Sequence, residues 1–245
     1  MDSFSFSGRI AVVTGAGSGI GRAIAQSLAA EQTILYLLGR NVEALEETAR
    51  SLERKGSCKS FLLETDLTKD GDVRRAVGRM KEQSDRVDFL VHCAAQHSLG
   101  SVESAPAQRF DELFHINVRA PYLLTQLLLP LLKHSQGQIV FINSLAGIKA
   151  NAKVSQYAAT KHALKALAGS LRHEVNPERL RVLSIFIGRT ATPMQESVHT
   201  LEGRPYRPNS LMQPEDVAAM VISALRQPPN SQVTEIYMEP LSRVC

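Results

Sequence analysis

A tyrosine and a lysine four residues apart, Tyr157 and Lys161, are the residues whose types and spacing point most directly to chemistry. Residues 154–175 have the apolar spacing of a helix, on which positions i and i+4 are neighbours. A lysine ammonium beside a phenol favours the phenolate, so we expect Lys161 to lower the pKa of Tyr157 from about 10. The pair therefore predicts a proton donor and acceptor near neutral pH.

A glycine-rich segment near the N-terminus predicts a phosphate-binding loop. Residues 9–14 form a short apolar run suited to a buried strand, and residues 22–30 are typical of a helix. Glycines between a strand and a helix permit a tight turn and a close approach of the backbone to a pyrophosphate, which the helix N-terminus attracts. The cofactor contacts predicted here are Gly15, Gly17, Ser18, Gly19, Ile20 and Gly21.

The end of the second expected strand indicates which dinucleotide is bound. NAD sites carry an acid at this point, but this chain has Gly39 followed by Arg40 and Asn41. A guanidinium binds a 2′-phosphate in a forked geometry, so we predict NADP(H), with Arg40 as the main contact. Asn41 is a possible second contact, and Ser18 adds a hydroxyl. The alternative is a surface arginine that opens the next helix.

These motifs resemble the short-chain dehydrogenase/reductase family, in its compact single-domain branch. The resemblance extends from about residue 7 to residue 240. It rests on the Thr-Gly-x-x-x-Gly-x-Gly pattern of residues 14–21, the order of the motifs, and the spacing of 13 residues from Ser144 to Tyr157. The further residues that carry it are Asp66, Asn117, Lys161, Thr192 and Pro193.

Strand and helix patterns alternate along the chain, which predicts an α/β fold. We expect a single domain over residues 1–245, a Rossmann-like, doubly wound parallel sheet of about seven strands with helices on both faces. The expected strands are residues 9–14, 33–38, 59–63, 88–93, 137–142, 180–187 and 233–238. The expected helices are residues 18–30, 41–55, 70–84, 107–134, 154–175 and 214–226.

Two segments depart from regular alternation. Pro121 falls inside the helical pattern of residues 107–134, so we expect a kink or break there. Residues 194–213 contain Gly203, Pro205 and Pro208, which favour a loop or short broken helices. Since ligands bind beyond the carboxyl ends of the strands, this segment after the sixth strand is a candidate substrate lid.

The resemblance implies a role for each of four catalytic residues. Ser144 donates a hydrogen bond to the substrate carbonyl, and Tyr157 transfers the proton. Lys161 stabilises the phenolate and binds the nicotinamide ribose, while Asn117 perturbs its helix and holds a water that links Lys161 to solvent. The alternatives are an ordinary turn residue for Ser144 and a polar surface or capping residue for Asn117.

The resemblance also assigns cofactor contacts after the later strands. Asp66 is expected to hydrogen-bond the adenine amino group, and Ile187 to flank the nicotinamide carboxamide. Where the family has Asn-Asn-Ala-Gly, residues 92–95 read His-Cys-Ala-Ala, and Ile187 replaces a proline. A buried, hydrogen-bonded His92 is favoured over a second catalytic base. The remaining predicted contacts are Leu67, Cys93, Ala94, Ala95, Gly188, Thr190 and Thr192.

Composition excludes several other classes. Hydrophobic residues are 44% and charged residues 21% of the 245, and no apolar run is long enough to span a bilayer. The N-terminus lacks the features of a signal peptide, and the three cysteines have neither metal-binding nor disulfide spacing. The net charge of +4 is spread along the chain, which argues against a nucleic-acid partner. We therefore expect a cytoplasmic protein with no membrane partner and no metal.

Together these features predict an NADP-dependent oxidoreductase that reversibly reduces a ketone or aldehyde. Two alternatives stay open, a non-catalytic NADP sensor or scaffold and a sugar-nucleotide epimerase. Sensors commonly lose the Tyr or the Lys, and epimerases usually carry more than the 56 residues that follow Arg189 here. Expected pocket residues are His97, Ala146, Lys153, Val154 and the lid. The helices at 107–134 and 154–175 resemble those that pair subunits, so a homodimer or homotetramer is expected.

Overall fold

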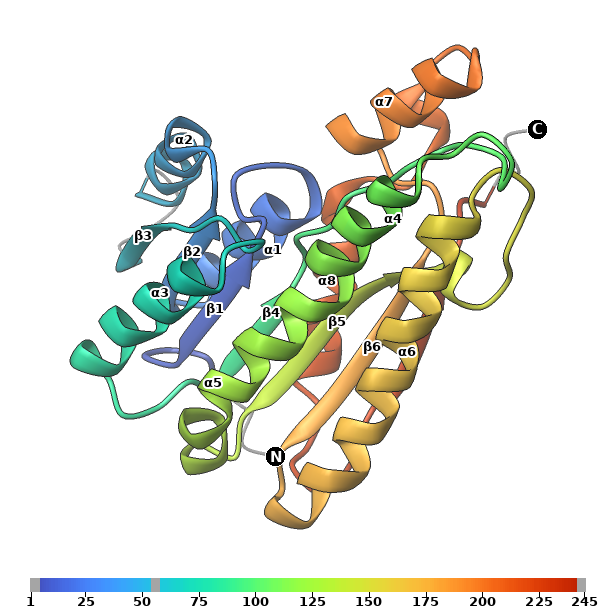
Figure 1. Cartoon of the computed structure of the whole chain (residues 1–245). Coiled ribbons are helices and arrows are strands. Elements are labelled where there is room, and N and C mark those ends of the chain that lie inside the picture. The colour runs from blue at the N-terminus through green and yellow to red at the C-terminus, as the bar shows by residue number, and fades with distance from the viewer. Residues whose placement is uncertain (1–4, 54–57, 242–245) are drawn as a thin grey trace.

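A seven-stranded parallel sheet forms the centre of the protein in a computed structural model that describes residues 5–53 and 58–241 (Figure 1). The spatial order of the strands is β3-β2-β1-β4-β5-β6-β7, and every neighbouring pair is parallel. Their bounds are β1 Ile10–Thr14, β2 Ile34–Gly39, β3 Ser60–Glu64, β4 Phe89–His92, β5 Gln138–Ser144, β6 Arg181–Ile187 and β7 Glu235–Met238. The predicted fold is confirmed, and its order reverses between β1 and β4, where doubly wound sheets bind ligands.

Helices cover both faces of this sheet. Apolar side chains of α1, α2 and α8 pack on one face, and those of α3, α5 and α6 pack on the other. The bounds are α1 Gly19–Ala30, α2 Val42–Glu53, α3 Asp70–Gln83, α4 Ala107–Phe114, α5 Ala120–His134, α6 Ser155–Val175, α7 Pro193–Glu202 and α8 Pro214–Leu225. Each expected helix is present, and the expected 107–134 helix is divided into α4 and α5.

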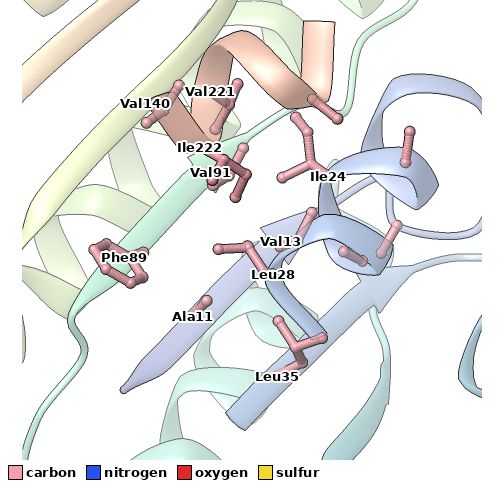
Figure 2. Close-up of a cluster of buried hydrophobic side chains, with 14 of the residues drawn as sticks. Ala11, Val13, Ile24, Leu28, Leu35, Phe89, Val91, Val140, Val221 and Ile222 are labelled. Atoms are coloured by element: carbon pink, nitrogen blue, oxygen red, sulfur yellow. The ribbon is translucent and has the colours of Figure 1, made fainter. Parts of the chain in front are cut away.

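Alternation along the strands divides the core into two layers. Ala11 and Val13 of β1 belong to one cluster with apolar side chains of α1 and α8, as Figure 2 shows, whereas Val12 belongs to the cluster on the opposite face. All five residues of β1 are buried, because successive side chains point to opposite faces and both faces are covered. The first and second strands therefore read as continuous apolar runs rather than as alternating ones.

A π-helical turn, His115–Arg119, separates α4 from α5. Pro121 follows it directly, and a proline has no N–H to donate to the carbonyl four residues earlier, which here is that of Asn117. The α-helical pattern is therefore interrupted at Asn117, and the break predicted from Pro121 is confirmed. Asn117 is 1% exposed and lies inside this turn.

The segment after β6 folds as short helices rather than one long element. Helix α7 ends where Gly203 adopts a left-handed conformation, with φ of 66°, and a short 3-10 turn follows at Pro208–Ser210 before α8. In Figure 1, α7 stands beyond the ends of the strands, at the top of the molecule. The expectation of short broken helices in 194–213 is confirmed.

Within residues 5–53 and 58–241, none of the helices combines the length and the apolar character needed to cross a membrane. Cys58 and Cys93 are free thiols, and Cys245 lies outside the described residues.

Candidate active site

A cavity of about 1580 Å³ opens at the carboxyl ends of the strands. Pockets for a single drug-sized ligand are usually about 300–1,000 Å³, so this one has room for a dinucleotide and a substrate together. Most of the predicted cofactor and catalytic residues line it, namely Gly15, Gly17, Ser18, Gly19, Ile20, Gly21, Arg40, Asn41, Leu67, Cys93, Ala94, Ala95, Ser144, Tyr157, Lys161, Ile187, Gly188, Thr190 and Thr192.

Two glycines of the loop after β1 are required by close backbone approaches. Gly15 has φ of +67°, and a Cβ on it would lie 3.0 Å from the Ala94 Cα. A Cβ on Gly21 would lie 2.3 Å from the Gly15 carbonyl oxygen. The loop therefore folds tightly onto α1 and against the segment after β4, with a concave face toward the cavity.

Thr14, the last residue of β1, joins this loop to the segment after β4. Its Oγ1 accepts hydrogen bonds from the backbone N–H groups of Cys93 and Ala94, at 3.0 and 3.1 Å. Cys93, which replaces an asparagine of the family pattern, and Ala94, which the pattern retains, are thus held by their backbone N–H groups. We did not predict this role of Thr14, although it opens the glycine pattern.

The N-terminus of α1 has groups available for an anion. Ser18 is the N-cap residue, but its side chain makes no capping hydrogen bond. The first N–H groups of a helix have no partners within that helix, and the helix dipole favours negative charge there. Together with the glycine cradle, the uncapped hydroxyl of Ser18 fits the phosphates of a dinucleotide.

Arg40 is exposed at the end of β2 and belongs to none of the ion pairs among the described residues. Its guanidinium lines the cavity and is free to bind a phosphate. The neighbouring Asn41 uses its Oδ1 to accept a hydrogen bond from the Ala44 N–H at 2.9 Å, so only its Nδ2 remains for a ligand.

Asp66 is the one predicted cofactor residue that does not line the cavity, although Thr65 and Leu67 on either side of it do. Its Oδ1 accepts hydrogen bonds from the backbone N–H and the Oγ1 of Thr68, at 3.0 and 2.7 Å. Its Oδ2 lies 3.8 Å from the Lys69 Nζ. The carboxylate is therefore engaged by its own turn.

Tyr157 and Ser144 meet at the wall of the cavity, from α6 and the end of β5. Burial raises the pKa of the Tyr157 phenol to about 12, and a hydrogen bond with Ser144 acts in the opposite direction. The prediction that Lys161 lowers this pKa is wrong for this structure, because the desolvation of the phenol dominates. Tyr157 is protonated at neutral pH.

Lys161 lies beneath Tyr157 and is 3% exposed. Its Nζ donates to the Ile142 carbonyl oxygen at 3.2 Å and lies 5.7 Å from the centre of the Tyr157 ring. Burial lowers the pKa of the ammonium to about 8. The helical spacing of four residues is confirmed, but the two side chains contact each other over the ring face.

Asn117 fixes the loop after β4 to α6. Its Oδ1 accepts from the Gln96 N–H, and its Nδ2 donates to the Gln96 carbonyl and to the Thr160 Oγ1, at 2.9, 2.9 and 3.0 Å. The side-chain amide is thus fully used, and Asn117 does not line the cavity. A water would therefore have to be held by its backbone carbonyl, which Pro121 deprives of its α-helical partner.

Asn143 has a similar positioning role that we did not predict. Its Oδ1 accepts from the Ser144 N–H at 2.8 Å, and its Nδ2 donates to the Lys161 carbonyl at 3.2 Å. It therefore joins Ser144 and Lys161, which come from different elements. The sequence offers no signal for this contact, because an asparagine before a turn is common.

His92 and Cys93 have no catalytic geometry. The His92 Nε2 lies 2.8 Å from the Thr125 Oγ1, its ring stacks on Phe141, and burial lowers its pKa to about 3. Burial also raises the pKa of the Cys93 thiol to about 12, although the Lys161 charge opposes this shift. A neutral imidazole and a protonated thiol hold the central strands, as expected for His92.

The far end of the cavity is lined by side chains from four segments. Val154 and Ala146 line it as expected, while Lys153 does not. His97, from the loop after β4, packs against Tyr157 with ring centres 4.5 Å apart. From the segment after β6 comes Arg189, and from α7 come Met194, Gln195, Val198 and Glu202. We did not predict the ion pair between the Arg189 Nη2 and the Glu202 Oε1, at 2.7 Å.

Comparisons with known proteins agree with this architecture. Residues 9–202 match the family described as short chain dehydrogenase. An uncharacterized oxidoreductase of Staphylococcus epidermidis is 29% identical over 234 residues, covering 95% of this chain and 97% of its own.

Solved structures of similar fold include complexes with a nicotinamide dinucleotide. An alcohol dehydrogenase from the archaeon Thermococcus sibiricus, complexed with 5-hydroxy-NADP, superimposes with a TM-score of 0.87 at 26% identity, covering 95% of this chain and 97% of that one. A metagenomic short-chain oxidoreductase in complex with NADP gives a TM-score of 0.84 at 27% identity, covering 98% and 100%.

Proposed function

The chain belongs to the short-chain dehydrogenase family, and on that premise we propose that it is an NADP-dependent oxidoreductase that reduces the carbonyl group of a ketone or aldehyde. The observation that carries the proposal is a single cavity with a phosphate cradle at one end and Ser144, Tyr157 and Lys161 at the other. The same site catalyses the reverse oxidation of the alcohol.

The residues at the phosphate end support NADP(H) as the cofactor. The glycine loop and Ser18 hold the pyrophosphate, and Arg40 binds the 2′-phosphate. Gly39 stands where an acid would repel that phosphate. The NADP complexes of similar structures agree with this assignment.

When bound, NADPH supplies the hydride, and the protein supplies orientation and a proton. Ser144 and Tyr157 hydrogen-bond the carbonyl oxygen, on which negative charge develops as its carbon is reduced. Tyr157 then donates its phenolic proton to this oxygen. Its raised pKa keeps that proton in place at neutral pH, so the group is ready for reduction.

Lys161 stabilises the phenolate that remains after proton transfer. Its ammonium lies on the ring face of Tyr157 and is fixed by the Ile142 carbonyl. The proton that restores Tyr157 passes through the ammonium and a water held by the Asn117 backbone. Asn117 and Asn143 are positioning residues, because they act on the loop and on Ser144 rather than on the substrate.

The direct test is turnover. Purified protein is incubated with NADPH and a panel of ketones, diketones, quinones and aldehydes, and absorbance follows NADPH oxidation. We expect reduction of at least one carbonyl and little or none with NADH. Tight NADPH binding without turnover of any compound would favour an NADP sensor and refute the proposed activity.

We also propose that the protein is a homodimer or homotetramer, formed in part through α4 and α5. Phe110, Phe114 and Tyr122 are exposed on these helices, with Tyr122 54% exposed. Light scattering measures the assembly directly. We expect Phe114→Glu to reduce its mass toward that of the 26.9 kDa chain, and an unchanged mass would contradict this interface.

A further inference from the structure

The substrate end of the cavity contains polar atoms that the protein does not pair. The Nδ1 of His97 and the Oε2 of Glu202 are buried and have no hydrogen-bond partner among the described residues. Both side chains belong to the cavity wall that includes Tyr157. Buried polar groups are nearly always paired in native proteins, so two orphaned atoms on residues that line one cavity point to a ligand.

The position of His97 is fixed by its surroundings. Arg109 of α4 donates from Nη2 to the His97 carbonyl oxygen at 3.1 Å and from Nη1 to the Gln96 Oε1 at 3.0 Å. The ring packs on Tyr157, and its buried Nδ1 has no hydrogen-bond partner in the described part of the chain. Burial lowers the pKa of His97 despite the opposing charge of Glu202, so the ring is neutral, with one donor and one acceptor.

Glu202, the last residue of α7, is a charged acceptor. Its Oε1 pairs with Arg189, whose hydrogen bond lowers the pKa of the carboxyl, so Glu202 is anionic. The second oxygen is left free to accept a hydrogen bond. Arg189 compensates the charge of Glu202, so the pair adds no net charge to this wall and leaves a hydrogen-bonding surface that suits a neutral polar group.

We propose that the substrate is a neutral ketone with a hydroxyl group on the carbon next to the carbonyl, and that His97 and Glu202 bind this hydroxyl. The inference rests on the proposed function, since Tyr157 must hold the carbonyl oxygen. A hydroxyl one carbon away reaches the side chain that packs on Tyr157, and it both donates and accepts.

The two unpaired atoms are enclosed in this structure, so a substrate reaches them after a local rearrangement. Helix α7, which carries Glu202, stands beyond the ends of the strands in Figure 1, so the proposal requires a local shift there or a turn of the His97 ring. The free energy lost by leaving both atoms unpaired favours such a rearrangement when a hydroxyl is present.

The test compares matched substrates at saturating NADPH. The pairs are cyclohexanone with 2-hydroxycyclohexanone, and 2-butanone with 3-hydroxy-2-butanone, with 2-oxobutanoate as the anion. We expect kcat/KM to be about 10- to 100-fold higher for each hydroxyketone, because one hydrogen bond to a charged group has roughly this effect. No advantage for the hydroxyl, or a preference for 2-oxobutanoate, would overturn the inference while leaving the proposed function intact.

Variants identify the residues responsible. We expect His97→Phe, which keeps a ring on Tyr157, and Glu202→Gln to reduce this preference to about threefold or less, mainly through KM. His97→Gln retains a donor and an acceptor and should keep part of the preference. Glu174→Gln, an exposed change on α6, is the control.

NADPH fluorescence checks that each variant still binds the cofactor. A preference that survives both His97→Phe and Glu202→Gln would refute the assignment. Absence of turnover with every ketone would instead refute the proposed function, and this inference with it.

Discussion

The two ends of the cavity differ in whether backbone or side chains form their walls. At the cofactor end, the walls are backbone, with Gly15 packed on Ala94 and the loop joined by Thr14. At the substrate end, the walls are long side chains from the loop after β4 and from α7, and two of their polar atoms are unpaired. Backbone sites leave little freedom for variation, whereas side-chain sites change with each substitution.

This difference between backbone and side-chain walls corresponds to the two ligands, a cofactor common to many enzymes and a substrate particular to this one. A dinucleotide offers the same phosphates in every enzyme that uses it, so a tight backbone cradle is sufficient. A substrate differs from enzyme to enzyme, and a segment outside the sheet such as α7 can carry its contacts. Four experiments test this division, from the largest expected effect to the smallest.

Loss of the Tyr157 hydroxyl should reduce the catalytic rate without reducing cofactor affinity, and this is the largest effect that we expect. We expect Tyr157→Phe to lower kcat about 10²- to 10⁴-fold, since it removes the proton donor. NADPH affinity, measured by fluorescence, should change little, because the cradle lies at the other end. Tyr237→Phe, at an exposed position of β7, is the control. A variant that keeps more than about a tenth of the activity would exclude Tyr157 as the acid.

Reversal of the charge at Arg40 should affect only the cofactor end. We expect Arg40→Asp to weaken NADPH binding about 10- to 100-fold and to shift the preference toward NADH, since it replaces a phosphate ligand with a repelling carboxylate. Steady-state kcat/KM for the two cofactors measures the shift. Arg50→Asp, an equal charge change at the exposed end of α2, should leave the ratio unaltered. The same ratio in both variants would contradict the NADP assignment.

As pH rises, the rate of carbonyl reduction should fall first because Lys161 loses its proton, well before Tyr157 does. The reaction needs a protonated phenol, which persists up to a pKa of about 12, and a charged ammonium, which is lost as pH rises through about 8. We expect kcat/KM to be flat below pH 7.5 and to fall toward tenfold per unit above about pH 8. Lys161→Arg, which keeps its charge, should move any such fall to higher pH if activity is retained. A profile flat to pH 10 would contradict this assignment.

Replacing a glycine by alanine should destabilise the fold in the loop after β1 and stabilise it in α3. A Cβ on Gly21 would contact the Gly15 carbonyl at 2.3 Å, whereas one on Gly78 of α3 has nothing within 4 Å. We expect Gly21→Ala to destabilise the fold by about 1–3 kcal/mol, and Gly78→Ala to stabilise it by about 0.5–1 kcal/mol. Thermal unfolding measures both. An unchanged melting temperature in Gly21→Ala would show that the cradle is less tightly packed than its geometry indicates.

Local patterns were sufficient to predict the fold and much of the candidate site. Apolar runs of five to eight residues, separated by helical patterns, predict the parallel sheet, and Pro121 predicts the break beside Asn117. The glycine loop is predictable because its constraints act between neighbours in sequence. Ser144 and Tyr157 were placed together by family spacing, and both line the cavity in the structure.

The prediction that Lys161 lowers the pKa of Tyr157 is wrong for a clear physical reason. Helical spacing predicts that Lys161 is near, but it does not reveal how far the pair is removed from water. Burial raises the pKa of Tyr157 and lowers that of Lys161, and both shifts favour the neutral form. The adenine contact of Asp66 stays a prediction, because Thr68 engages only its Oδ1.

The sequence by itself determined the sheet and the glycine cradle, because these depend on periodicity and on spacing along the chain, and it predicted Tyr157 as the proton donor. Only the tertiary structure decided which side chains face that donor. Arg189 and Glu202 are 13 residues apart, and His97 is more than 90 residues before either, so no local pattern joins them. Their meeting depends on where β4, β6 and α7 end in space, and burial at that point sets the charge of each group.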